Sequence, residues 1–328
     1  MRRSGPPSAL VCRGGACYGL FTMVRPAATD LTVSPVLVSA LGLVVAALCW
    51  RVVTSRRQGR PVVGWRNGAA LLATVLLGVA YVSPLATLAA HYLLTAHLVQ
   101  VTLVMGFVPP LLLLALDPAS VRGARWGRAM EWAVHPVLAM LLVNVVFFGW
   151  HIRPIYQACL LHPELYALQQ VSLLVVSLGF WWPIVKPGGC GRWCMGSWGK
   201  LGYILVATVP QTFAGLLFAL AHRAFYADYA DAARSLGVNP LTDQQLAGAC
   251  MAVLSKLALF AAFSVVLWRM LEPGGAEGDV DDDGGGGDDR DAPTPVRPGA
   301  PAWLGLLDGS RLRDEPPVRH RPATADRR

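Results

Sequence analysis

The sequence predicts an all-α integral membrane protein: a bundle of seven transmembrane helices with an outside N-terminus, a cytoplasmic C-terminus and a disordered C-terminal tail. Three observations predict this fold class, namely the apolar composition, the recurrence of apolar windows and the uneven distribution of Lys and Arg. Hydrophobic residues make up 54% of the 328 residues and charged residues 15%, whereas soluble domains carry about 25% charge. The composition therefore indicates a chain that lives in a lipid bilayer.

Apolar windows of membrane-spanning length recur along the chain. A helix needs about 20 apolar residues to cross about 30 Å of hydrocarbon. The predicted spans are 33–53, 68–88, 93–116, 134–151, 166–185, 200–221 and 246–268. These runs are too continuous for the alternating pattern of an outer-membrane barrel, and backbone groups in lipid must be satisfied internally, so helices are expected.

The distribution of Lys and Arg near the predicted helix ends sets the orientation, because cytoplasmic loops are enriched in both. One side holds twelve of them: Arg51, Arg56, Arg57, Arg60, Arg66, Arg122, Arg125, Arg128, Lys186, Arg192, Lys200 and Arg269. The other side holds four: Arg25, Arg153, Arg223 and Arg234. This ratio predicts the outside N-terminus. The net charge of +8 then reflects basic loops that face an anionic inner leaflet, and it calls for no nucleic-acid partner.

The two ends of the chain are predicted to lie outside the membrane domain, which spans 33–271. Residues 1–32 form an N-terminal extension that is basic but lacks a sustained apolar segment, so it is a poor signal peptide, and Met23 is an alternative start. Residues 272–328 include the run "GDVDDDGGGGDD" followed by Pro- and Arg-rich sequence. Such a segment buries too little apolar surface to order itself, so we expect a disordered cytoplasmic tail.

Five of the seven histidines fall at the predicted outer face. They are His91, His97, His151, His162 and His222. Histidines at headgroup level are often simply tolerated there, and this reading is the alternative to a functional role for His91, His162 and His222. His97 lies roughly 6 Å into the third span if that helix begins near Leu93. His97 and His151 each belong to a longer pattern.

Three segments carry that pattern: "TAHLVQVTLVMGFVPPLLLLALDP", "WHIRPIYQACLLHPELYALQQVSLLVVSLGFWWPIV" and "NPLTDQQLAGACM". In order and spacing they resemble the signature regions of the CtaG family of cytochrome c oxidase assembly factors, over roughly residues 85 to 270. The resemblance implies a multi-pass protein of the bacterial plasma membrane that helps to assemble haem-copper oxidases, at the stage where copper enters the catalytic subunit on the outer side. It also implies oxidase subunits or copper chaperones as partners.

The resemblance extends to individual residues. The matching positions are His97, Gln100, Pro109, Pro110, Pro118, Trp150, His151, Pro154, Tyr156, Trp181, Trp182, Pro183, Asp243, Gln244, Gln245, Gly248 and Met251. This chain departs from the family pattern where the family shows further histidines and a tryptophan: it has Val101, Tyr166, Gln170 and Ala252 there.

These departures bear on metal binding, because two histidines four residues apart on a helix share a face and can hold one ion. This chain has neither of the two histidine pairs of the family, because Val101, Tyr166 and Gln170 occupy their positions. The remaining candidate ligands for a transient copper ion are His97, His151 and Met251, with Met105 and Cys250 as further soft side chains. Two imidazoles, or one with a thioether, can hold Cu(I) but do not form a rigid zinc site. The alternative is that the two histidines only hold the bundle together by hydrogen bonds.

Further residues are assigned to the pocket and to a partner surface. We expect His91, Gln100, Tyr156, Tyr166 and Gln170 to line the pocket. Asp243, Gln244 and Gln245 form a candidate docking surface for a partner. The alternative is that this group caps the seventh helix, where a carboxylate meets free amides and the positive end of the helix dipole.

Lys256, near the middle of the seventh span, supports a different function. An ionisable residue at that depth is a functional candidate by default, and a small-solute or ion and proton carrier is the alternative to the assembly factor. The scarcity of carboxylates in the predicted spans counts against a carrier and against a retinal Schiff base. The remaining reading is a lysine whose long stem lets its ammonium reach polar groups.

The cysteines and the catalytic motifs contribute little. Cys190 and Cys194, in "CGRWC", lie in a connection assigned to the reducing side, so no stable disulfide is expected there. No second pair completes a four-ligand metal site. The sequence contains no phosphate-binding glycine loop, no H-E-x-x-H and no G-x-S-x-G, so no enzymatic activity is predicted.

Overall fold

The computed structural model describes residues 10–13, 16–19, 26–31, 34–59, 64–118, 121, 128–187 and 193–272. The predicted tail from residue 273 onward and much of the N-terminal extension lie outside the described residues. The described part of that extension includes a two-stranded antiparallel sheet, β1 (Leu10–Arg13) and β2 (Ala16–Gly19). These strands are an addition to the predicted all-α fold.

All other regular elements of the described residues are helical. In chain order they are α1 (Pro35–Arg57), α2 (Gly64–Val82), α3 (Pro84–His91), α4 (Leu94–Thr102), the π-helix η1 (Leu103–Phe107), α5 (Val108–Ala115), α7 (Arg128–Ala133), α8 (Pro136–Trp150), α9 (Arg153–Leu161), α10 (Pro163–Val185), α11 (Ser197–Ala219), α12 (Ala227–Ser235), α13 (Pro240–Val253), the 3-10 helix η2 (Leu254–Lys256) and α14 (Leu257–Leu271).

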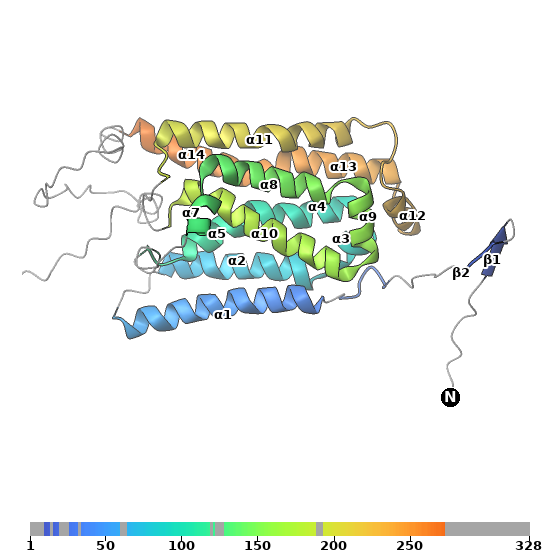
Figure 1. The fold of residues 1–328 in the computed structure, drawn as a ribbon, viewed down its shortest axis with the longest axis horizontal. Helices are drawn as coiled ribbons and strands as arrows, with labels where there is room; N and C mark the ends of the chain where they lie inside the picture. Colours follow the sequence, from blue (N-terminus) through green and yellow to red (C-terminus); the bar gives the residue numbers. More distant parts are fainter. Residues whose placement is uncertain are drawn as a thin grey trace, which may run out of the picture.

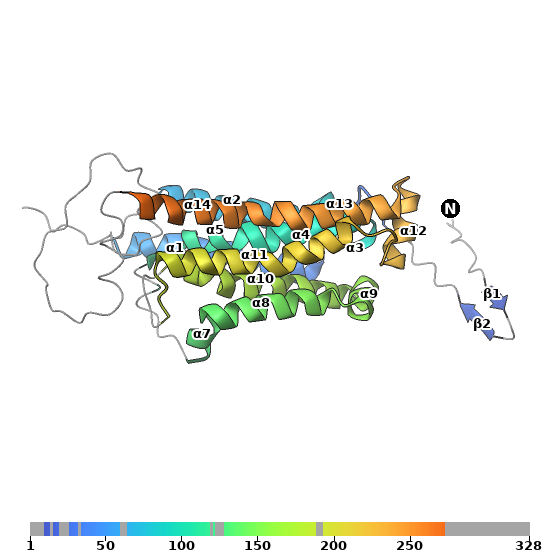
Figure 2. The same cartoon turned by 90° about the horizontal axis from the view of Figure 1, so that it is seen from above.

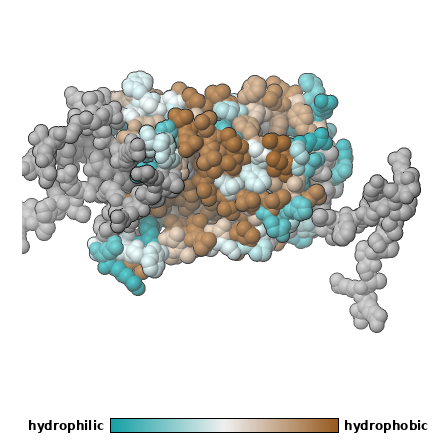
Figure 3. Space-filling view, viewed as in Figure 1, coloured by the Kyte–Doolittle hydropathy of each residue, from teal (hydrophilic) through white to brown (hydrophobic). Residues whose placement is uncertain are grey.

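The long helices run along one axis and form an elongated bundle (Figures 1 and 2). Apolar residues form a band across the middle of the visible face, and hydrophilic residues lie toward both ends (Figure 3). Six helices of the described chain are long and apolar enough to cross a membrane, and there are seven if the bent pair of α8 and α9 counts as one span. The protein is therefore a multi-pass membrane protein, as predicted.

The fourth predicted span differs most from its prediction. α8 has only 15 residues, and α9 continues it after a bend of 68°. The segment 152–165, predicted as a loop, is therefore mostly helical. α9 forms because Pro154 pre-sets its first turn, and Tyr156 and Cys159, three residues apart, bury the same side.

The third span, made of α4, η1 and α5, lies at the centre of the bundle. It is the most buried of the candidate spans, whereas α1 is the least buried. It contacts α2, α10 and α13. Residues on the third span are thus placed where several helices can contribute to one site.

Two helices near the middle of the bundle contain an irregular segment, and the two segments face each other. The π-helix η1 precedes Pro109 and Pro110, which lack the backbone N–H groups that a regular helix would use. The third span accommodates these prolines by a widened turn. In the seventh span, η2 interrupts the helix between α13 and α14, and η1 and η2 are in contact.

The tightest helix crossing joins α11 and α13. A Cβ atom on Gly248 would lie 2.5 Å from the amide nitrogen of Ala219 and 2.5 Å from the carbonyl oxygen of Gly215. A Cβ atom on Gly215 would lie 2.8 Å from the amide nitrogen of Ala252. Each helix thus presents Gly-x-x-x-Ala, the small-residue spacing that lets two membrane helices approach backbone to backbone.

The predicted basic connections gather at one end of the bundle. The C-terminal ends of α1, α5, α10 and α14 lie there with the N-terminal ends of α2 and α11 (Figure 1). The opposite end carries α3, α9 and α12 and the N-terminal ends of α4 and α13 (Figures 1 and 2). The short helices at this second end position the candidate site.

Candidate functional site

His97 and His151 meet at the end of the bundle that carries α3, α9 and α12. His97 lies in the first turn of α4 and His151 is the residue that ends α8. Their ring centroids are 5.6 Å apart. The ring of Tyr156, from α9, lies 5.0 Å from that of His97 and is stacked on that of His151 at 5.6 Å. The two predicted histidines and Tyr156 therefore share one pocket, which we call the histidine pocket.

A chain of hydrogen bonds fixes the proton of His97. The side-chain amide of Gln100 donates to the Ala80 carbonyl at 2.7 Å, so its oxygen faces the other way and accepts from the Tyr166 hydroxyl at 2.5 Å. Since the Tyr166 proton is used there, its oxygen accepts from His97 Nδ1 at 3.2 Å. A neutral His97 therefore carries its proton on Nδ1 and a lone pair on Nε2.

His151 has the same protonation pattern for a different reason. Its Nδ1 lies 2.6 Å from the Phe147 carbonyl oxygen, which can only accept, so Nδ1 is the donor. The Nε2 atoms of His97 and His151 are both buried and make no hydrogen bond. The histidine pocket thus holds two imidazole lone pairs that are free to bind a proton or a metal ion.

The remaining predicted pocket residues are distributed around this centre. Tyr166 and Gln100 lie in the pocket as described, and Gln170 follows Tyr166 by one turn of α10, fully buried with both polar atoms of its amide unpartnered. His91 is half-buried at the end of α3. Met251 is buried on α13, where it lines a neighbouring cavity. Within the described residues, no group of three or more His, Cys, Asp and Glu side chains forms a metal site.

Two tyrosines of the connection between α11 and α13 complete the pocket, and neither was predicted from the sequence. The Tyr226 hydroxyl donates to the His151 carbonyl at 2.9 Å. The Tyr229 hydroxyl donates to the Ala89 carbonyl and lies 2.9 Å from the Tyr156 hydroxyl, which is therefore the donor in that pair. Burial raises the pKa of Tyr226 to about 12, so its hydroxyl stays protonated. The available signal was the spacing of three in "YADY", which places both rings at the start of the short helix α12.

Asp243 lies in the first turn of α13 but caps a different helix from the one expected. Its carboxylate accepts from the amides of Leu94 at 2.8 Å and Thr95 at 3.1 Å, and so caps α4. The cap of α13 is Asn239, whose side chain accepts from the Leu241 amide at 2.9 Å. The predicted cap of the seventh helix by Asp243 is therefore wrong, because the carboxylate, at 4% exposed, finds the free amides of the neighbouring helix instead.

Gln244 and Gln245 hold the connection that follows α11. Gln244 accepts from the Phe225 amide at 2.6 Å and donates to the Arg223 carbonyl at 3.1 Å. Gln245 donates to the Ala221 carbonyl at 3.1 Å. The side chains of the candidate docking surface thus make hydrogen bonds within the protein, and a docking role stays a prediction.

Two other expectations have definite outcomes. Lys256 donates to Gln211 Oε1 at 3.2 Å and to Ser255 Oγ at 3.0 Å, so its ammonium reaches polar side chains within the bundle. Cys194 is disulfide-bonded, which contradicts the expected reduced state. The expectation was based on the reducing compartment assigned to this connection. A compartment favours one redox state, but the fold decides whether a second sulfur atom lies close enough to form a bond.

Comparison with known proteins identifies the family. The family model described as cytochrome c oxidase caa3 assembly factor (Caa3_CtaG) matches residues 46–272. No curated protein and no solved structure matched the chain. The matched region contains every helix from α2 to α14, including all the residues of the histidine pocket. The chain belongs to the family of caa3-type cytochrome c oxidase assembly factors.

Proposed function

We propose that this protein assists the copper-centre maturation of a haem-copper oxidase at the outer face of the bacterial plasma membrane. Its family is one of cytochrome c oxidase assembly factors. Copper is the cargo in this proposal. His97 and His151 hold it briefly, after a copper chaperone has delivered it or before it passes to an oxidase subunit. The role requires no catalytic residue.

The observation that carries the proposal is the pair of free imidazole lone pairs. Both Nε2 atoms are buried and unpartnered, and both Nδ1 atoms donate to groups that hold the rings in place. Metal-binding histidines are typically oriented in this way through their second nitrogen. Two neutral imidazoles suit Cu(I), which accepts few ligands, and they bind it weakly enough for release.

The position of the histidine pocket supports the outer location. The pocket lies at the bundle end opposite most of the described basic residues, which include Arg56, Arg66, Lys200 and Arg269. Only Arg153, Arg223 and Arg234 of the described arginines and lysines near helix ends lie at the pocket end. Because basic residues mark the cytoplasmic side, the pocket faces the outer compartment in this proposal. Copper would then enter and leave without crossing the membrane.

A pair of reporter fusions tests the orientation. A reporter that is active only in the cytoplasm should be active when fused after Arg269 and silent when inserted in the segment 152–165. Insertion at the junction between α9 and α10, at exposed Leu161 and His162, disturbs the fold least. The reverse pattern of activity would place the histidine pocket on the cytoplasmic side and refute the outer location.

Difference spectra of membranes test the function and separate it from the carrier alternative. Membranes from a strain that lacks this chain should show loss of the spectral signals of the mature haem-copper centre, while the oxidase subunits are still synthesised. A small-solute or proton carrier based on Lys256 predicts unchanged oxidase spectra. Restoration by the wild-type chain, and equally by a Lys256→Leu variant, would support assembly over transport.

A further inference from the structure

A cavity lies directly beneath the histidine pocket, toward the middle of the membrane. Leu98, next to His97, and Phe147, whose ring is stacked on that of His151 at 4.3 Å, both line it. Its walls come from α4, η1, α8, α10, α11, α13, η2 and α14. The cavity therefore continues the pocket inward.

The cavity lies where two spans lose their regular helical geometry. Its lining includes Met105 and Gly106 of η1 and Ser255 of η2. π-Helical turns often occur at functional sites, and facing interruptions of two membrane helices near mid-membrane are typical of ligand sites. The position thus indicates a binding site in addition to the histidine pocket.

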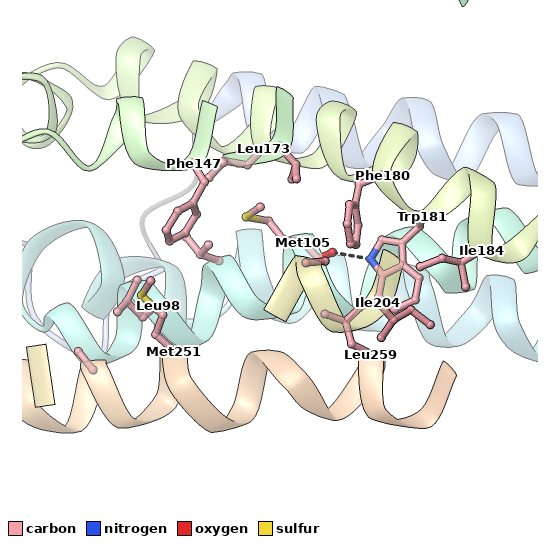
Figure 4. Close-up of a cluster of buried hydrophobic side chains, with 14 of the residues drawn as sticks. Leu98, Met105, Phe147, Leu173, Phe180, Trp181, Ile184, Ile204, Met251 and Leu259 are labelled. Carbon is pink, nitrogen blue, oxygen red and sulfur yellow. Dashed lines mark hydrogen bonds between the residues drawn. The ribbon is translucent and has the colours of Figure 1, made fainter. Parts of the chain in front are cut away.

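The chemistry of the lining favours a soft cation. Met105 and Met251 are both buried, and their thioether side chains extend into the same cluster (Figure 4). Asn144 Oδ1 and Ser177 Oγ are buried in the lining and make no hydrogen bond. The Asn144 amide nitrogen donates to the Met140 carbonyl at 2.8 Å, which leaves the side-chain oxygen as a buried acceptor that makes no hydrogen bond. Thioethers and acceptor oxygens bind cations, and thioethers select soft ions such as Cu(I).

We propose that Met105 and Met251 form a second site for Cu(I) in this cavity, with Asn144 and Ser177 as supporting polar groups. This inference rests on the proposed copper function and extends it: the ion moves from the two imidazoles to the two thioethers and back. Met105 follows His97 by eight positions, or about 12 Å along the helix axis, so the step is a short one. The transfer exchanges ligands without any change in oxidation state.

Lys256 limits how far the ion can travel. Its ammonium donates to Gln211 and Ser255, and both of these side chains line the cavity. This positive charge repels any cation in the adjoining part of the cavity, and little screening is available in a low-dielectric environment. Cu(I) at the thioethers is therefore bound more weakly than it would be beside a neutral wall, and it does not pass beyond Gln211 and Ser255. The cavity is thus a blind end that stores the ion, and the ion leaves on the side from which it entered.

Anaerobic titration of the purified full-length protein in lipid nanodiscs with Cu(I), combined with X-ray absorption, tests the second site. The wild type should bind two Cu(I) ions with both nitrogen and sulfur scatterers. A Met105→Leu/Met251→Leu variant, which nearly conserves side-chain volume, should bind one ion with nitrogen scatterers only. Met195→Leu is the matched control, because Met195 lies outside the cavity beside Gly199, and it should behave like the wild type.

The outcomes distinguish the two sites. One bound ion with nitrogen scatterers alone in the wild type overturns the thioether site, leaves the histidine pocket standing and assigns the cavity to water. Sulfur scattering that persists in the Met105→Leu/Met251→Leu variant also overturns it, because the sulfur would then come from another methionine or from a cysteine. A His97→Ala/His151→Ala variant that still binds one sulfur-coordinated ion supports the thioether site. Copper binding that is unchanged in that histidine variant would instead refute the proposed function.

Discussion

Replacing His97 or His151 by alanine should lower oxidase activity in membranes to nearly the level of a strain that lacks the protein. A two-ligand site fails when either ligand is lost, so the double variant should be no worse than either single one. Loss of groups that merely support a ligand already costs about 10- to 100-fold in metal affinity, and loss of a ligand itself should cost at least as much. Added copper should partly restore activity by mass action.

The control for this prediction is His162→Ala. His162 also lies at the pocket end of the bundle, but it is exposed and outside the pocket, so its replacement should leave oxidase activity unchanged. The amount of each variant in the membrane must be measured by immunoblot, since a structural role for the pair predicts less folded protein instead of less active protein. A double variant with wild-type activity and wild-type level would eliminate the site.

Replacing Gly248 by leucine should produce the largest loss of stability of any single change in the bundle. Any Cβ atom there would lie 2.5 Å from backbone atoms of Ala219 and Gly215, and backbone cannot rotate away as a side chain can. Overpacking commonly costs about 1–3 kcal/mol, and a collision with backbone belongs at or beyond the upper end. α11 and α13 would have to separate, which also displaces Gln244, Gln245 and Asp243 from their partners.

Gly202→Leu provides the matched comparison. Gly202 also lies within α11, and a Cβ atom there would meet nothing within 4 Å. Thermal unfolding followed by fluorescence-detected size exclusion should show a strong drop in the unfolding temperature for the Gly248 variant and little change for the Gly202 variant. Equal effects of the two substitutions would show that the close crossing does not limit stability.

The membrane spans were predictable because length and apolar composition determine them almost alone. The short helices α9 and α12 were not, since neither is long or apolar enough to give a signal in a window of membrane length. Their positions depend on tertiary contacts, such as the bond from Tyr226 to the His151 carbonyl. Prolines marked the irregular turn in the third span, but a π-helix is one of several ways to accommodate them.

The candidate site, too, was predictable only in part. The family motifs brought His97, His151, Tyr156 and Gln100 to attention, and the structure places all four in one pocket. The tautomers of the two histidines could not be derived from sequence, because they follow from which group each Nδ1 meets. The partner of Asp243 was predicted wrongly for a similar reason. A local pattern suggests a local cap, and only the fold reveals an amide 149 residues away.

That long separation has a consequence for the order in which the protein becomes functional. The chain is made from its N-terminus, so the third span enters the membrane well before residue 243 is synthesised. Until then the amides of Leu94 and Thr95 lack their carboxylate, and the first turn of α4, which carries His97, is left without its cap. An unfinished chain therefore lacks one of the contacts that position the first histidine. The cap on α4 forms only after the start of the seventh span has been synthesised.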